Sequence, residues 1–224
     1  SVIPGSDGVI EDAGKAHEAA KKLGYPVMVK ASAGGGGKGI RIVRSEEELE
    51  EAFESARSET IKAFGDDKMY MEKLVEKARH VEVQVLGDSH GNVIHLGERD
   101  CSLQRKNQKV LEEAPCPVLP ENVREKMCNS AVLAAKAAGY QSAGTIEFLY
   151  DEASQEYYFM EMNTRIQVEH PITEMVTGVD IVKEQINIAD GKKLSFSQKD
   201  IKINGCSIEC RINAENPSRN FAPC

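Results

Sequence analysis

Four consecutive glycines stand between two short apolar segments near the start of the chain, and they restrict what this region can form. The stretch reads ASAGGGGKG, and the flanking segments 25–30 and 40–43 are predicted to be strands. A P-loop needs Gly-Lys followed by Ser or Thr at a helix start, whereas here Lys38 is followed by Gly39 and a strand. Because glycine lets backbone amides approach an anion closely, we predict that this loop covers phosphates. A flexible surface turn is the alternative. Lys30, on the preceding strand, would face the same anion.

The remaining pattern predicts an α+β protein in two parts that meet near residue 75. Helices are expected at 10–23, between Ser45 and Phe64, at 121–138 and at 171–189. Further strands are expected at 69–75, 81–85, 93–96, 145–150 and 157–162. Ser45 and Glu48 form an expected capping box, and the buried face of the second helix is expected to comprise Leu49, Ala52, Phe53, Ala56, Ile61 and Phe64. We therefore expect one domain over residues 1–74 and another over 75–224.

Two predicted strands, 145–150 and 157–162, each carry a glutamate between apolar residues. If the hairpin turns at Ser154, Glu147 lies opposite Glu161 and Leu149 lies opposite Phe159. Facing carboxylates repel each other unless a cation lies between them. Asn163 follows on the same face, and two acids with an amide oxygen suit Mg²⁺ or Mn²⁺. The alternative is a pair of solvated glutamates on an outward face.

Polar residues alternate with other residues from position 160 to position 170. In an extended chain, alternate residues share one face. This face would carry Glu161, Asn163, Arg165, Gln167 and Glu169. A solvated edge strand is one interpretation, and a row of ligand-binding side chains is the other.

The charge balance limits the classes of partner. The 224 residues include 28 basic and 36 acidic residues, a net charge of −8, so a bulk affinity for nucleic acid or an anionic membrane is not expected. No apolar run approaches the ~20 residues of a membrane span. The six cysteines form no Cys-x-x-Cys pair, which predicts reduced thiols in a cytoplasmic protein. Both ends read as interrupted, so we expect an internal fragment of a longer chain.

Several longer motifs identify a family. They are KASAGGGGKGIR, MEKLVEKARHVEVQV, GERDCSLQRKNQKVLEEAP, GTIEF, FMEMNTRIQVEHPITEMVTG and ECRINAENP. In this order and with this spacing, they resemble the biotin carboxylase family of ATP-grasp enzymes over nearly the whole chain. The resemblance implies an ATP-grasp fold, with a small glycine-loop lid and a larger mixed-sheet part. It is closest to the biotin carboxylase component of bacterial acetyl-CoA carboxylase.

The resemblance also implies residue roles. ATP-binding positions are Lys30, Gly36, Gly37, Glu72, Lys73, Val75, His80, Gln104, Leu149 and Met160, the last two placed on either side of adenine. Metal ligands are Glu147, Glu161 and Asn163, in agreement with the hairpin argument. The bicarbonate site comprises Lys109, Arg165, Gln167, Val168 and Glu169, and Arg211 faces biotin. Among these, Arg165, Glu169, Arg211 and Lys109 are the implied catalytic residues.

The implied activity is the carboxylation of carrier-bound biotin by ATP and bicarbonate through carboxyphosphate. The implied partners are a biotinylated carrier and a carboxyltransferase, and the implied full-length assembly is a homodimer. The corresponding parts of propionyl-CoA, methylcrotonyl-CoA and pyruvate carboxylases are not separated by these motifs. Two rival classes are another ATP-grasp ligase, such as a carbamoyl-phosphate synthetase, and a non-catalytic nucleotide-binding module.

Overall fold

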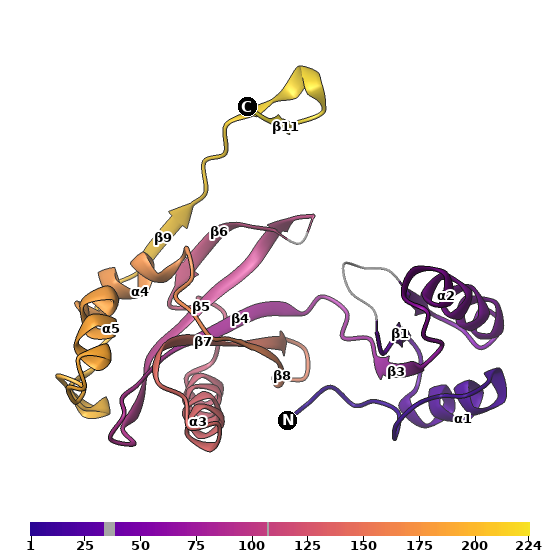
Figure 1. Ribbon diagram of the computed structural model, residues 1–224, viewed down its shortest axis with the longest axis horizontal. Coiled ribbons are helices and arrows are strands. Elements are labelled where there is room, and N and C mark those ends of the chain that lie inside the picture. The colour runs from indigo at the N-terminus through magenta and orange to yellow at the C-terminus, as the bar shows by residue number, and fades with distance from the viewer. Residues whose placement is uncertain (34–38, 107) are drawn as a thin grey trace. The chain divides into compact units, whose positions relative to one another are not determined.

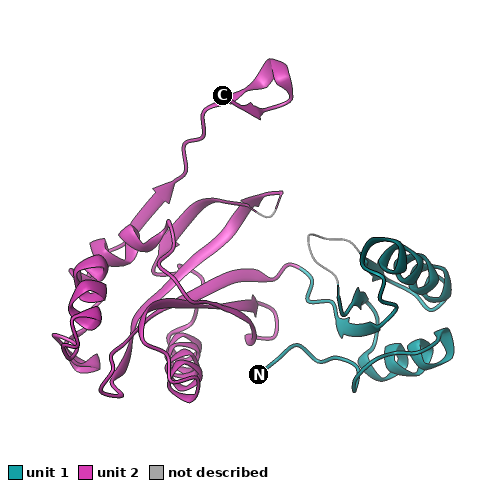
Figure 2. Cartoon of the chain, viewed as in Figure 1, with its two compact units in different colours: residues 1–76 teal, residues 77–224 magenta. Residues whose placement is uncertain are grey.

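The protein folds into two compact units, each with its own sheet and core. The structure, a computed structural model, describes residues 1–33, 39–106 and 108–224 (Figure 1). Unit 1 comprises Ser1–Glu76 and unit 2 comprises Lys77–Cys224 (Figure 2). The α+β class is confirmed. Residues 34–38 of the predicted phosphate cover, which include Gly36, Gly37 and Lys38, lie outside the described residues.

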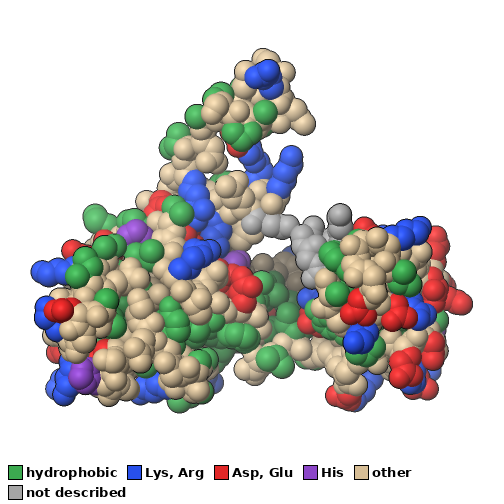
Figure 3. Space-filling view, in the orientation of Figure 1, with side chains coloured by type: hydrophobic (Ala, Val, Ile, Leu, Met, Phe, Trp, Pro, Cys, Tyr) green, Lys and Arg blue, Asp and Glu red, His purple; other side chains and the backbone are tan. Residues whose placement is uncertain are grey.

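Unit 1 is a small antiparallel sheet packed against two helices. The strands, in the order β2-β1-β3, are β1 (Val27–Ala31), β2 (Ile40–Val43) and β3 (Met69–Lys73), and the helices are α1 (Ala13–Leu23) and α2 (Leu49–Phe64). Alternate strand residues and one face of each helix form a continuous apolar core. Figure 3 shows acidic side chains gathered on this unit, where Glu50, Glu51 and Glu54 of α2 are exposed.

Several local predictions for unit 1 were wrong. The first helix begins at Ala13 because Asp12 is its N-cap and accepts a bond from the backbone N–H of Lys15 at 2.8 Å. The expected capping box does not form, since the Glu48 side chain accepts from the backbone N–H of Arg44 instead. The expected core residues Ile61 and Phe64 are 49% and 41% exposed. The buried face of α2 instead continues from Ala56 to Thr60, which is 0% exposed.

Unit 2 is built on a six-stranded antiparallel sheet in the order β8-β7-β4-β5-β6-β9, not the mixed sheet expected. Its strands are β4 (Arg79–Gly87), β5 (Val93–Arg105), β6 (Gln108–Ala114), β7 (Ser142–Asp151), β8 (Glu156–Asn163) and β9 (Ser207–Cys210). Its helices are α3 (Glu121–Ala137), α4 (His170–Thr177) and α5 (Ile181–Ala189). Short elements follow: η1 (Gln198–Asp200), η2 (Pro217–Arg219) and the ribbon of β10 (Glu215–Asn216) with β11 (Ala222–Pro223).

The two faces of β4 have different environments. Val81, Val83 and Val85 pack in one apolar cluster with residues of α3. The alternate residues Glu82 and Gln84 point to the other face, where they are also fully buried. Polar side chains inside the protein need partners, so this second face must carry a polar network.

The sequence patterns missed two features of unit 2. Strand β5 runs as far as Arg105 and β6 follows it, although the pattern predicted a strand only at 93–96. The predicted helix at 171–189 is two helices, because the chain turns at Gly178 with a left-handed φ of 71°. None of the described helices is long and apolar enough to cross a membrane.

Candidate functional site

A polar cavity of about 310 Å³ lies in unit 2 over one face of the sheet. Its lining comprises His80, Gln104, Gln108, Lys109, Glu147, Glu161, Asn163, Arg165, Gln167, Val168, Glu169 and Arg211. The predicted row from Glu161 to Glu169 is therefore gathered in one cavity. The expected geometry of the row was only partly right, since β8 ends at Asn163 and the remaining residues lie on the turn into α4.

The hairpin of β7 and β8 brings the two predicted acids together. Glu147 pairs with Glu161 across the ladder, as expected. The register then shifts by one residue, so that Phe159 pairs with Phe148 and the expected pairing of Leu149 with Phe159 is wrong. The extra residue is Met160, which makes this irregularity a β-bulge. Met160 is 41% exposed as a result.

Lys109 supplies a positive charge at the centre of three carboxylates. Its Nζ donates to Glu82 at 2.5 Å, to Glu169 at 2.7 Å and to Glu147 at 2.9 Å. Burial alone would lower the pKa of Lys109, but the attraction of Glu82 and the other carboxylates outweighs it and raises that pKa. Lys109 therefore stays protonated and balances acidic groups contributed by β4, β7 and the turn before α4.

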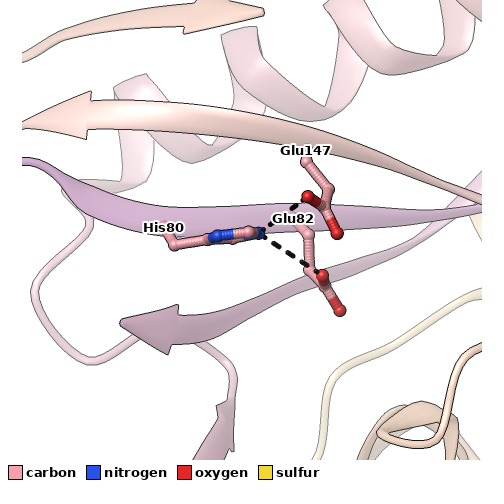
Figure 4. A group of neighbouring side chains, drawn as sticks. All are labelled: His80, Glu82 and Glu147. Carbon is pink, nitrogen blue, oxygen red and sulfur yellow. Dashed lines mark ion pairs between the residues drawn. The ribbon is translucent and has the colours of Figure 1, made fainter. Parts of the chain in front are cut away.

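Glu147 is the most connected acid of the cavity. Besides Lys109, it accepts a bond from Gln167 Nε2 at 3.0 Å and lies 3.1 Å from His80 Nε2. Figure 4 shows His80 directed at both Glu147 and Glu82. Burial would raise the pKa of Glu147, but His80 and Lys109 lower it below its ordinary value. Glu147 is thus an anion although its residue is only 5% exposed.

Glu169 is held between two cations. Its Oε1 accepts from Lys109, and its Oε2 accepts from Arg211 Nη2 at 2.8 Å. Burial would raise the pKa of Glu169, but Lys109 and Arg99 hold it below the ordinary range. Arg211 also donates through Nε to Glu112 at 2.7 Å. A carboxylate base and a guanidinium are therefore in direct contact within the cavity.

Sequence reasoning missed the charged residues that support this cavity from behind. Glu82, Arg99 and Glu112 are fully buried and do not line it. The signal available was the alternation VEVQV, in which Glu82 and Gln84 share one face. We interpreted that face only as part of an alternating strand, because no sequence pattern shows that α4 covers it.

The residues assigned to metal fit such a role by chemistry. Glu147, Glu161 and Asn163 line the same cavity and offer oxygen atoms only, which suits Mg²⁺ or Mn²⁺. Glu161 is exposed, and no hydrogen bond or ion pair is found for its side chain among the described residues. Asn163 Oδ1 accepts only a long bond of 3.4 Å from Arg165. These two oxygen donors are therefore available to a cation.

Of the predicted nucleotide residues of unit 1 that the structure describes, Lys30 is on β1 and the others are on or just after β3. Lys30 forms an ion pair with Glu72, and each side chain is about three-quarters buried. Lys73 donates to the carbonyl oxygens of Gly24 at 2.7 Å and Tyr25 at 2.9 Å, and so links the segment after α1 to β3. Val75 is half-buried just beyond the strand. The other four are in unit 2. His80 and Gln104 are bonded to each other at 3.1 Å, and Leu149 and Met160 are on β7 and β8.

Comparison with known proteins identifies the family. The family described as "Carbamoyl-phosphate synthase L chain, ATP binding domain" matches residues 1–197. Biotin carboxylase 1 of Bacillus subtilis is 59% identical over 222 residues, which are 99% of this chain and 49% of that protein. The chain therefore spans about half the length of the curated relatives it matches.

Solved structures agree with this assignment. A biotin carboxylase complex with β-γ-ATP from Campylobacter jejuni is 56% identical, with a TM-score of 0.85 over 99% of this chain and 49% of that one. The biotin carboxylase domain dimer of Hydrogenobacter thermophilus 2-oxoglutarate carboxylase, in complex with MgADP, ADP and bicarbonate, is 59% identical with a TM-score of 0.83 over the same shares. The chain belongs to the carbamoyl-phosphate synthase L chain, ATP binding domain family, and within it to the biotin carboxylase ATP-grasp domains that its motifs predicted.

Proposed function

We propose that the protein carries out the biotin carboxylase reaction, in which ATP and bicarbonate carboxylate biotin on a carrier protein. The observation that carries this proposal is the position of Glu169 between Lys109 and Arg211 in a cavity that also holds the paired acids Glu147 and Glu161. One cavity thus combines a base, two anion-binding cations and oxygen ligands for a metal. One solved relative is a complex with β-γ-ATP and another is a complex with MgADP, ADP and bicarbonate, which supports the same assignment.

The first step is the phosphorylation of bicarbonate. A bicarbonate oxygen attacks the γ-phosphorus of ATP, ADP leaves, and carboxyphosphate forms. Lys109 and Arg165 bind the bicarbonate anion beside Gln167 and Val168, and Glu169 accepts its proton. Bound Mg²⁺ or Mn²⁺, held by the Glu147, Glu161 and Asn163 set, would neutralise phosphate charge during this transfer.

The second step is the carboxylation of biotin. Carboxyphosphate breaks down to CO₂ and phosphate. The released phosphate takes the proton of the biotin ureido nitrogen, and that nitrogen attacks CO₂. Negative charge develops on the ureido oxygen when this proton leaves. Arg211 stabilises that charge because a guanidinium remains protonated at neutral pH.

ATP binding is assigned to residues in each unit. In unit 1 these are Lys30, Gly36, Gly37, Glu72, Lys73 and Val75, and in unit 2 they are His80, Gln104, Leu149 and Met160. The exposed Met160 and the half-buried Leu149 offer apolar contacts for adenine. The Lys30 ammonium offers a charge for the phosphates.

The proposal extends to the setting of the whole protein. We assign it to the acetyl-CoA carboxylase reaction that makes malonyl-CoA for fatty acid synthesis, in the cytoplasm, as a homodimer that works with a biotinylated carrier and a carboxyltransferase. A propionyl-CoA, methylcrotonyl-CoA or pyruvate carboxylase is the alternative, and one relative belongs to a 2-oxoglutarate carboxylase. The acceptor is chosen by the carboxyltransferase, so these residues do not decide it.

A two-part activity assay on the full-length protein tests the proposal. Bicarbonate should stimulate ATP hydrolysis, and labelled bicarbonate should be incorporated into free biotin. Glu169→Gln should lower both rates by about 10²–10³-fold, the usual effect of losing a charged group at the reacting atoms. Glu125→Gln, an exposed acid on α3, is the matched control and should leave both rates unchanged. ATP binding without either activity would instead support the non-catalytic module.

A further inference from the structure

Arg99 is a buried charge that lies outside the proposed reaction site. It is in β5, its residue is 0% exposed, and it is absent from the lining of the cavity. A buried guanidinium is costly unless its donors are bonded and its charge is balanced. Its partners therefore show what this charge does in the protein.

The guanidinium of Arg99 joins three elements. Toward β4, its Nε donates to Glu82 Oε1 at 2.7 Å, and its Nη2 lies 2.6 Å from the same oxygen. Its Nη1 donates to Gln84 Oε1 at 2.9 Å. Toward β7 it donates to Thr145 Oγ1 at 3.3 Å. Toward α4 it donates to Thr173 Oγ1 at 2.8 Å. One planar group thus fixes the sheet and α4 relative to each other.

These contacts form a closed chain of linked groups behind the cavity lining. Glu82 uses one oxygen for Arg99 and the other for Lys109. Thr173 lies four residues after Glu169, so both lie on the same side of the first turn of α4. Lys109 and Glu169 are themselves bonded at 2.7 Å. Arg99 therefore holds both members of this pair, one through Glu82 and one through α4.

We infer that Arg99 is a positioning residue that sets the distance between the Lys109 ammonium and the Glu169 carboxylate for bicarbonate. This inference rests on the proposed function. Neither Arg99 nor Thr173 lines the cavity, so each acts only through its neighbours. A small displacement of α4 would move Glu169 away from Lys109. Such a misplacement lowers the rate of a reaction that depends on the alignment of its reacting groups.

The test compares variants of the full-length protein in bicarbonate-dependent ATP hydrolysis. Arg99→Met should lower kcat/KM for bicarbonate by about 10–100-fold, the usual range for residues that orient a site from behind. Its KM for ATP should change less than about twofold, since none of its bonds reaches an assigned ATP residue. Arg99→Lys keeps the charge beside Glu82 but loses the planar guanidinium with its several fixed donors. It should therefore recover part of the kcat/KM for bicarbonate that Arg99→Met loses.

Two matched controls separate positioning from stability. Arg124→Met removes a partly buried ion pair with Glu98, which is next to Arg99 in sequence but on the opposite face of β5. This variant should lower stability without a selective bicarbonate effect. If Arg99→Met does not fold, Thr173→Val is compared with Thr177→Val, whose hydroxyl donates to the carbonyl of Thr173 at 2.7 Å and is not bonded to Arg99. Thr173→Val should lower kcat/KM for bicarbonate several-fold, and Thr177→Val should not.

The inference is overturned if folded Arg99→Met, or Thr173→Val in its place, keeps the parent kcat/KM for bicarbonate within about twofold. It is also overturned if the KM values for ATP and bicarbonate rise equally, since that pattern indicates a general loss of structure. Failure of the proposed function has a different signature. In that case the parent protein itself would show no bicarbonate-dependent hydrolysis.

Discussion

Replacing each of the paired acids by glutamine should separate the folding role of the site from its metal role. Glu147 and Glu161 face each other across one ladder, yet their surroundings differ. Glu147 is buried, is bonded to Lys109 and Gln167, and lies 3.1 Å from His80 Nε2. Glu161 is exposed and has no bonded partner among the described residues. We expect Glu147→Gln to destabilise the ligand-free protein and Glu161→Gln to leave its stability unchanged.

The expected sizes follow from these contacts. Removing one member of a buried ion pair costs roughly 3–5 kcal/mol, and the lower end applies because the amide oxygen of glutamine can still accept a bond. A loss of about 3 kcal/mol corresponds to about 6–12 °C in Tm for a unit of this size. Changes at exposed positions away from special features stay within about 0.5 kcal/mol. For Mg·ATP, losing one charged contact of about 1.5–3 kcal/mol weakens binding about 10–150-fold in both variants.

Urea unfolding without nucleotide gives the two stabilities, and calorimetric titration with Mg·ATP gives the two affinities. The result that would refute the reasoning is equal destabilisation by both variants, because it would place Glu161 in the same buried network as Glu147. Unchanged Mg·ATP affinity in Glu161→Gln would remove the pair from the metal site. Glu156→Gln, an exposed acid on the same strand outside the cavity, is the control for both measurements.

Three further predictions address other parts of the chain. Asp88 accepts bonds from Asn92 and from backbone N–H groups that include Leu194, and these outweigh burial to lower its pKa to about 2 from 3.8. This stabilisation is complete above pH 4 and is lost as the pH falls through about 2, so Asp88→Asn should cost about 2 kcal/mol in urea unfolding at pH 7 and much less near pH 2. Gly87→Ala would place Cβ 2.4 Å from the carbonyl oxygen of Tyr140, and the required backbone shift should cost about 1–3 kcal/mol in the same assay. Replacing Gly36 and Gly37 by valine should raise the KM for ATP in the hydrolysis assay, and kinetics equal to the parent would argue against a phosphate cover.

The parts of the site that sequence predicted are those set by local geometry. A short turn between two strands fixes which residues face each other, so the pairing of Glu147 with Glu161 followed from the position of Ser154. The same argument failed two residues further along, because a bulge at Met160 is inserted without any sequence signal that we could interpret. The prediction was therefore correct at the metal end of the hairpin and wrong toward its turn.

The parts that sequence did not predict depend on contacts between distant elements. Strand β6 has the polar sequence QKVLEEA, and it becomes a strand because β5 and β9 bond to it on both sides. Glu82 is in an alternating strand whose polar face is normally solvated, and it is buried here because α4 covers that face. Arg99 carries no local signal at all. Its role follows only from partners that are 15 to 74 positions away in sequence.

The two ion pairs of Glu169 lead to a last prediction, which divides the site between its two proposed substrates. Arg211 holds one oxygen of Glu169 and is itself held by Glu112, so it can be removed without disturbing the bond from Lys109. Arg211→Ala should therefore still form carboxyphosphate and hydrolyse ATP in response to bicarbonate, while biotin carboxylation falls by about 10²–10³-fold.

Glu169→Gln should instead lower both rates, because the base that accepts the bicarbonate proton is lost. The ratio of biotin carboxylation to ATP hydrolysis, measured in one reaction, is thus the informative quantity. It should fall sharply for Arg211→Ala and stay near the parent value for Glu169→Gln. Parallel loss of both activities in Arg211→Ala would show that Arg211 acts on bicarbonate as well, and that its contact with Glu169 is part of the first step.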